Sequence, residues 1–120
     1  VYYGNHLYNH FNSTNIDQID LEKNFLINQK ILDNFENGLN LFAYPFGQPN
    51  SCYNKTTNDI LKKKTNHIFT SYHALNINKA DEVSHRISFD NNIKRNDDIK
   101  LSVFKGYIRN ILSGKKNKYI

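Results

Sequence analysis

The chain has 120 residues, 38% of them hydrophobic and 22% charged, so it is one domain or part of one, with a modest core. Its net charge of +5 sits mainly in "LKKK" (61–64) and "GKKNKYI" (114–120), without the interleaved aromatic residues that typify nucleic-acid binding, so no nucleic-acid partner is expected. A single cysteine, Cys52, excludes an intrachain disulfide, and no apolar run is long enough for a transmembrane segment.

The N-terminal residues are aromatic and polar. Tyr2 and Tyr3 predict the end of a strand, and Gly4 predicts a turn after it. The chain begins with Val1 rather than methionine, which predicts a processed product or a piece of a longer protein.

The next segment has apolar residues at three- and four-residue spacing, which predicts an amphipathic helix from Asp17 to Phe35 that faces a core. Asp17 and Asp20 favour its N-terminal end, and Asn37-Gly38 marks its stop. The residues expected to face the core are Ile19, Leu21, Phe25, Leu26, Ile31, Leu32 and Phe35.

The remaining elements alternate between strand and helix patterns. In order they are a strand in 39–47, a helix over 55–65, strands over 67–72 and 85–89, and a helix over 99–112. The last helix is expected to start after an Asp97 or Asp98 cap and to bury Ile99, Val103, Phe104, Tyr107, Ile108 and Leu112. This alternation predicts an α/β fold with a parallel sheet or part of a barrel of βα units, because these strands are too few to close a barrel.

The most informative short motif is "GNHLYNH" (4–10), which places His6 and His10 four residues apart. Two histidines at this spacing can face one cation, and each binds zinc through one ring nitrogen. Taken alone the pattern is weak, since surface or core histidines explain most such pairs.

Longer sequence segments make a metal-binding role for the two histidines more convincing. "GNHLYNHFNSTN", a helix, and "LFAYPFGQPN" together resemble the polysaccharide deacetylases of carbohydrate esterase family 4, which include chitin and peptidoglycan de-N-acetylases. In that family a Gly-Asn-His-[Thr/Ser]-x-x-His segment supplies two zinc-ligand histidines, and a Phe-Ala-Tyr-Pro-[Tyr/Phe]-Gly strand end lines the active groove. An apolar "HIFTSY"-like strand and an Arg-Ile strand follow in the same order. The resemblance runs from about Gly4 to Phe89 and covers roughly the C-terminal two-thirds of a distorted (β/α) TIM-like barrel.

The resemblance implies roles for individual residues. His6 and His10 would be zinc ligands, and Tyr44, Pro45 and Tyr8 would line the substrate groove. The Tyr44 backbone N–H would help hold the oxyanion, although strand termination and packing also explain Tyr44-Pro45. His85 would stand in for the late catalytic histidine that protonates the leaving amine. His73 is a lesser candidate for that role, and His67 is interpreted as a surface or strand-edge residue.

Three departures from the family pattern stand out. Leu7 replaces the usual Thr or Ser, and Ala43 stands where many members have an arginine that orients the catalytic aspartate. The paired aspartates of the family's first motif, which supply the base and the third zinc ligand, have no match before His6. Asp97-Asp98 is interpreted as a helix cap and not as a substitute.

The function expected from the resemblance is a metal-dependent hydrolase that removes N-acetyl or O-acetyl groups from a surface polysaccharide. Residues 1–113 would be a partial catalytic domain with its first strand or strands missing, and 114–120 a basic tail. Without the aspartate motif this chain alone would be inactive. The alternative is an inactive remnant that binds glycan or forms homo-oligomers. The resemblance favours a bacterial cell envelope setting, while the sequence leaves the compartment open.

Overall fold

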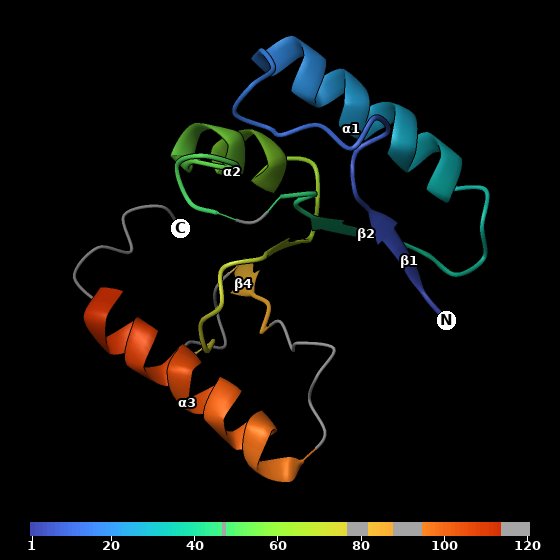
Figure 1. Ribbon diagram of the computed structural model, residues 1–120. Coiled ribbons are helices and arrows are strands. Elements are labelled where there is room, and N and C mark those ends of the chain that lie inside the picture. Colours follow the sequence, from blue (N-terminus) through green and yellow to red (C-terminus); the bar gives the residue numbers. More distant parts are fainter. Residues whose placement is uncertain (47, 77–81, 88–94, 114–120) are drawn as a thin grey trace.

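Four parallel strands form one sheet in the order β1-β2-β3-β4 in the computed structural model (Figure 1). The structure describes residues 1–46, 48–76, 82–87 and 95–113. Its elements in chain order are β1 (Tyr3–Asn5), α1 (Gln18–Leu32), β2 (Gly38–Ala43), α2 (Lys55–Lys62), β3 (His67–Thr70), β4 (Val83–His85) and α3 (Asn96–Ser113). The predicted α/β class with a parallel sheet is confirmed, and the described sheet is open, with β1 and β4 at its edges.

One face of this sheet carries the hydrophobic core. The strand registers align Asn5, Phe42, Ile68 and Val83 in a single row across all strands, and each of these side chains is buried. Leu21 and Phe25 of α1 and Leu61 of α2 pack against this row. Because side chains alternate along a strand, the residues next to this row within each strand point to the other face of the sheet, where most of them are half-exposed.

Helix α1 forms at the predicted place. Asp17 caps it, since its side chain accepts a hydrogen bond from the Asp20 N–H at 2.8 Å. The helix ends at Leu32, three residues before the predicted end at Phe35. Of the residues expected to face the core, Leu21, Phe25 and Leu32 do so, whereas the prediction is wrong for the exposed residues Ile19, Leu26, Ile31 and Phe35.

Two glycines allow close backbone approaches. The prediction that Gly4 makes a turn is wrong, because Gly4 lies within β1, where an added Cβ would be 3.2 Å from the Leu41 carbonyl oxygen. Gly38 opens β2, and a Cβ there would come within 2.2 Å of the Leu32 carbonyl oxygen. Gly38 therefore lets the chain turn tightly from the end of α1 into the sheet.

The second half of the chain differs more from expectation. α2 begins at Lys55, as predicted, after an Asn54–Thr57 capping box, buries Leu61, and ends at Lys62, three residues before the predicted end at 65. β4 covers Val83–His85, so its described part precedes the predicted strand over 85–89, and residues 88–89 lie outside the described residues. The basic tail 114–120 also lies outside them.

Helix α3 lies beyond β4, away from α1 and α2 (Figure 1). It begins at Asn96, so Asp97 and Asp98 lie within its first turn and not at the expected cap position, and the Asp98 carboxylate accepts a hydrogen bond from the Arg95 N–H at 3.1 Å. The expectation that its apolar face is buried is wrong for all six residues named for it, because Ile99, Val103, Phe104, Tyr107, Ile108 and Leu112 are exposed. Among the described residues no helix has the length and apolar character needed to cross a membrane.

Candidate metal and anion site at the carboxyl ends of the strands

The carboxyl ends of the four strands meet at one edge of the sheet, the usual position of ligand sites in parallel α/β proteins. His6 follows β1, Tyr44 follows β2, Ser71 follows β3 and Arg86 follows β4. The sheet thus gathers at one edge residues that lie far apart in sequence.

His6 is oriented by the backbone of the neighbouring strand. Its Nδ1 lies 2.7 Å from the Ala43 carbonyl oxygen, which can only accept, so Nδ1 carries the proton and Nε2 keeps a free lone pair in the neutral ring. Burial is the main cause that lowers the pKa of His6 below 6.5, the Ala43 carbonyl opposes it, and positive charge on His10 and Arg86 lowers it further. His6 is therefore held in the neutral form that binds metals.

His10 lies beside His6, as the motif predicted. The two ring centroids are 4.9 Å apart, and the Phe46 ring contacts His10 on another side at 5.1 Å. The loop between them contains two backbone conformations that favour glycine, Leu7 with φ of 61° and His10 with φ of 53°. Such strain persists only where surrounding contacts impose it, and it often occurs at functional sites.

Asn5 and Leu7 supply those surrounding contacts. The buried Asn5 side chain donates to the Phe25 carbonyl oxygen at 2.9 Å, and its oxygen accepts from the Leu7 N–H at 3.1 Å. The Leu7 side chain is itself part of the core. Leu7 thus anchors the loop by packing, where the resembled family has a hydroxyl. Sequence analysis missed the role of Asn5, although a polar residue at a core-facing strand position next to His6 was a signal for it.

Arg86 is the second residue that sequence analysis missed. Its guanidinium donates to the carbonyl oxygens of Thr70 at 3.0 Å and Tyr44 at 3.1 Å, and to the Ser71 hydroxyl. These bonds fix a positive charge at the ends of β2 and β3, close enough to affect the pKa of His6. Arg86 therefore gives this edge of the sheet affinity for anionic groups.

His85 lies at the end of β4 on the face that carries the core. It is only 8% exposed, its Nδ1 lies 2.8 Å from the Thr70 hydroxyl, and its backbone N–H donates to Asn76 at 2.6 Å. His6, in contrast, lines a hollow of about 320 Å³ on the opposite face with Leu41, Ala43 and Phe69. This placement does not suit the expected role of His85 in protonating a leaving group beside the histidine pair.

Tyr44 also departs from its expected role. Its ring is buried, stacks on Tyr53 at 4.8 Å and donates its hydroxyl to Asn58 at 2.7 Å, so it cannot stack on a sugar. Its backbone N–H donates to the Phe69 carbonyl oxygen at 3.0 Å and so is already engaged as a donor, contrary to the oxyanion role. The packing interpretation of Tyr44 therefore holds.

The other residues named from sequence occupy more exposed positions. Pro45 is half-buried and Tyr8 is exposed, so both remain accessible to a ligand. His73 lies in the loop after β3, and its ring nitrogen is 2.9 Å from the carbonyl oxygen of Ser102 in α3. His67 is the first residue of β3, and its ring nitrogen is 2.8 Å from the Ser84 hydroxyl. Within the described residues, no group of three His, Cys, Asp or Glu side chains could hold a metal ion.

Comparisons with known proteins give no match: no family model, curated protein or solved structure is similar to this chain.

Proposed function

We propose that the His6–His10 edge of the sheet is part of a metal-dependent hydrolytic site that removes acetyl groups from a polysaccharide. The observation that supports this most directly is the hydrogen bond of 2.7 Å from His6 Nδ1 to the Ala43 carbonyl oxygen. It orients the ring and selects the tautomer that a metal ligand needs, as second partners of zinc-binding histidines do. The resemblance to polysaccharide deacetylases supplies the reaction, and the sheet would be part of their TIM-like barrel.

The two histidines fit zinc as part of its full set of ligands. His6 and His10 would hold the ion through neutral imidazole nitrogens, and a catalytic zinc site usually has three protein ligands. The third would come from residues outside the described ranges or from another chain. Zinc, when bound, lowers the pKa of a water ligand and polarises a carbonyl group.

The residues of this chain have separate tasks in this proposal. Asn5 and Leu7 hold the loop that places His10 against His6. Arg86 attracts anionic oxygen, either the developing oxyanion or the acetate product, and its charge weakens the binding of a cation to the histidines. Tyr8 is an exposed aromatic side chain that would be available to contact a sugar ring.

A second candidate is an inactive remnant that binds glycan or associates with another copy. It is favoured by the lack of a third ligand among the described residues and by the outer edges of β1 and β4, with which no described strand pairs. Both candidates keep the histidine pair, so they differ in catalysis and not in fold.

The test is zinc content followed by activity. Elemental mass spectrometry of the purified chain should find zinc in near-equal molar amount, and His6→Ala or His10→Ala should remove it. His67→Ala is the matched control, because His67 belongs to the same sheet near the opposite ends of the strands and should leave zinc unchanged. Zinc that survives both site substitutions would exclude the histidine pair as ligands.

Acetate release separates the two candidates. The longest natural form of the protein, supplied with zinc, should release acetate from an N-acetylglucosamine oligomer, and His10→Ala should abolish the release. Zinc binding without acetate release would favour the inactive remnant.

A further inference from the structure

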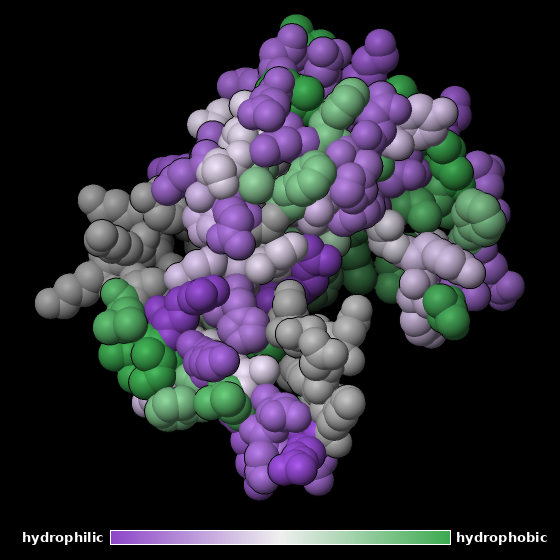
Figure 2. Space-filling model, viewed as in Figure 1, coloured by the Kyte–Doolittle hydropathy of each residue, from purple (hydrophilic) through white to green (hydrophobic). Residues whose placement is uncertain are grey.

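Among the described residues, helix α3 is attached to the rest of the molecule by small and polar residues. Gly106 is buried, and a Cβ there would lie 3.7 Å from Ala74 and from the His73 ring. His73 also donates to the Ser102 carbonyl oxygen at 2.9 Å. Because small and polar residues form this attachment, the apolar residues of α3 face outward, and Figure 2 shows hydrophobic residues gathered along the helix in the lower part of the view.

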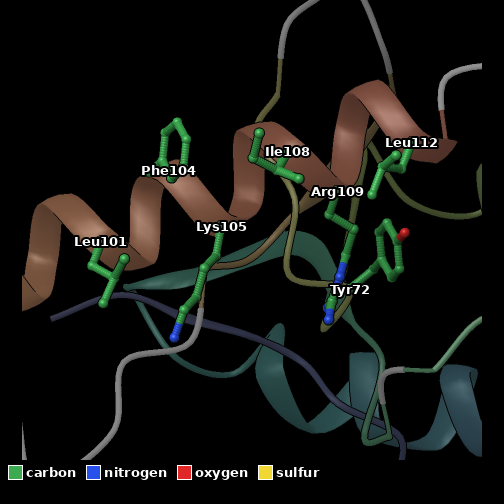
Figure 3. A pocket seen from close by; sticks show the side chains of 7 residues that line it. All are labelled: Tyr72, Leu101, Phe104, Lys105, Ile108, Arg109 and Leu112. Atoms are coloured by element: carbon green, nitrogen blue, oxygen red, sulfur yellow. The ribbon is translucent and has the colours of Figure 1, made fainter.

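Part of that apolar surface forms a groove. Leu101, Phe104, Ile108 and Leu112 recur at three- and four-residue spacing, and Tyr72 from the loop after β3 lies beside them (Figure 3). The groove has a volume of about 610 Å³, within the range of about 300–1,000 Å³ typical of ligand pockets. At 1.5 Å per residue, the stretch from Leu101 to Leu112 is about 16 Å long, so an extended alkyl chain could lie along it.

Two cations lie on this groove, and no described acidic residue forms an ion pair with either of them. The Arg109 guanidinium sits 5.5 Å from the centre of the Tyr72 ring, and Lys105 lies one helical turn before it. Ion pairs elsewhere join Lys64 to Glu22 and Lys100 to Asp97. Lys105 and Arg109 take part in none within the part of the chain that the structure describes. The groove therefore combines an apolar floor with unneutralised positive charge.

A second apolar groove lies on α1 and differs in charge. It has a volume of about 450 Å³ and is lined by Ile19, Leu26 and Ile27 together with Glu22 and Lys23, one residue of each sign. Glu22 is already paired with Lys64 at 2.7 Å. Apolar exposure alone is thus common to both grooves. Among the described residues the α3 groove carries two cations without an ion pair, Lys105 and Arg109, whereas the α1 groove carries one, Lys23.

We infer that the α3 groove binds a single-chain anionic amphiphile, such as a long-chain carboxylate. The alkyl chain would lie along Leu101, Phe104 and Ile108, and the acid group would contact Lys105 and Arg109. An open apolar groove with Tyr72 at its side and two neighbouring cations suits one such molecule better than a membrane surface, which would favour basic residues spread along a polar face. This site is independent of the histidine pair.

The test is calorimetric titration of the whole chain with dodecanoate below its micelle concentration. We expect saturable binding, and binding of dodecyltrimethylammonium, which has the same tail and the opposite charge, about tenfold weaker or undetectable. Substituting Lys105→Gln and Arg109→Gln together should weaken dodecanoate binding roughly fivefold, since both side chains are exposed and screened by water.

Two isoleucines provide a matched pair of apolar variants, because Ile108 on the α3 groove and Ile27 on the α1 groove are both 37% exposed. Ile108→Asp should weaken dodecanoate binding at least about tenfold, and Ile27→Asp should leave it unchanged. Circular dichroism should show both variants folded.

Three results would overturn the inference: equal affinity for the two amphiphiles, equal loss in the two isoleucine variants, or no binding of monomeric dodecanoate. In the last case, binding to anionic phosphatidylglycerol vesicles would assign α3 to a membrane surface. Self-association abolished by Ile108→Asp would assign it instead to a second copy.

Discussion

Helices α1 and α3 look alike in sequence, yet they relate to the core in opposite ways. Both carry apolar residues at helical spacing, and α1 buries Leu21 and Phe25 against the sheet. α3 turns its apolar residues to solvent and contacts the body of the protein near Gly106. The difference shows that an amphipathic pattern predicts a helix with an apolar face, but not what that face contacts.

Two phenylalanines give the largest expected contrast. Phe25 on α1 is 1% exposed and Phe104 on α3 is 56% exposed. Phe25→Ala should lower the free energy of unfolding by about 3–5 kcal/mol, because it leaves a cavity in the core. Phe104→Ala should change it by less than about 0.5 kcal/mol. Urea denaturation followed by circular dichroism measures both, and similar losses would mean that the face of α3 is buried in solution.

Two asparagines extend the comparison to polar side chains. Asn5→Ala should cost about 1–3 kcal/mol, since it removes the acceptor of the buried Leu7 N–H and the side-chain hydrogen bond to the Phe25 carbonyl oxygen. It should also reduce zinc retention by loosening the loop between His6 and His10. Asn34→Ala is the control, because Asn34 donates to the Lys30 carbonyl oxygen at an exposed position. If Asn5→Ala lowered stability but not zinc content, Asn5 would support the fold and not the position of the two histidines.

Replacing either of two glycines by alanine should change the stability of the protein in opposite directions. Gly38→Ala should destabilise by about 2 kcal/mol, since the new methyl group would lie 2.2 Å from the Leu32 carbonyl oxygen at the end of α1. Gly106→Ala meets only contacts of 3.7 Å, so the gain in helix propensity should stabilise α3 by about 0.5 kcal/mol. Thermal melts of both variants test this, and destabilisation by Gly106→Ala would show that α3 packs more closely than described.

The smallest effect concerns pH. Burial lowers the pKa of His6 below 6.5, so the unfolded state takes up a proton on this ring before the folded state does. The contribution of His6 to stability should therefore be complete above about pH 6.5 and fall as the pH drops through 6.5 towards the lower folded pKa. His6→Gln should make stability less dependent on pH in this window. Denaturation of this variant and of the parent protein at a series of pH values tests the prediction, and an unchanged pH dependence would contradict it.

Local patterns predicted most of the fold. Asp17 and the Asn37-Gly38 stop bracketed α1 closely because a side-chain cap and a tight glycine turn are encoded within a few residues. The choice between Leu21 and Ile19 as the inward residue was not encoded locally, since both fit a helical apolar stripe and only the sheet decides. The predicted bounds of β4 were wrong at their start, because the strand begins at Val83 where it pairs with Ile68 of β3, and that pairing is not encoded locally.

In the candidate site, too, features encoded by neighbouring residues were predicted, and features set by tertiary contacts were not. The spacing of His6 and His10 predicted their proximity, since a short loop joins them. Arg86 could not be assigned from sequence, because its partners Thr70 and Tyr44 come from two other strands and bind through backbone oxygens that no residue type reveals. Tyr44 was misplaced because a tyrosine at a strand end fits both a groove and a core, and burial beside Tyr53 is a tertiary outcome.

The strand order β1-β2-β3-β4 has a consequence for how the chain assembles. Among the described strands, each one after β1 pairs with the strand that precedes it, so β2, β3 and β4 each pair with a strand that has already been synthesised. Pairing of consecutive segments keeps loop closures short and favours rapid folding. During synthesis, β1, α1 and β2 could form a first unit whose free edge receives β3 and then β4, so that the histidine loop is in place before Arg86 leaves the ribosome.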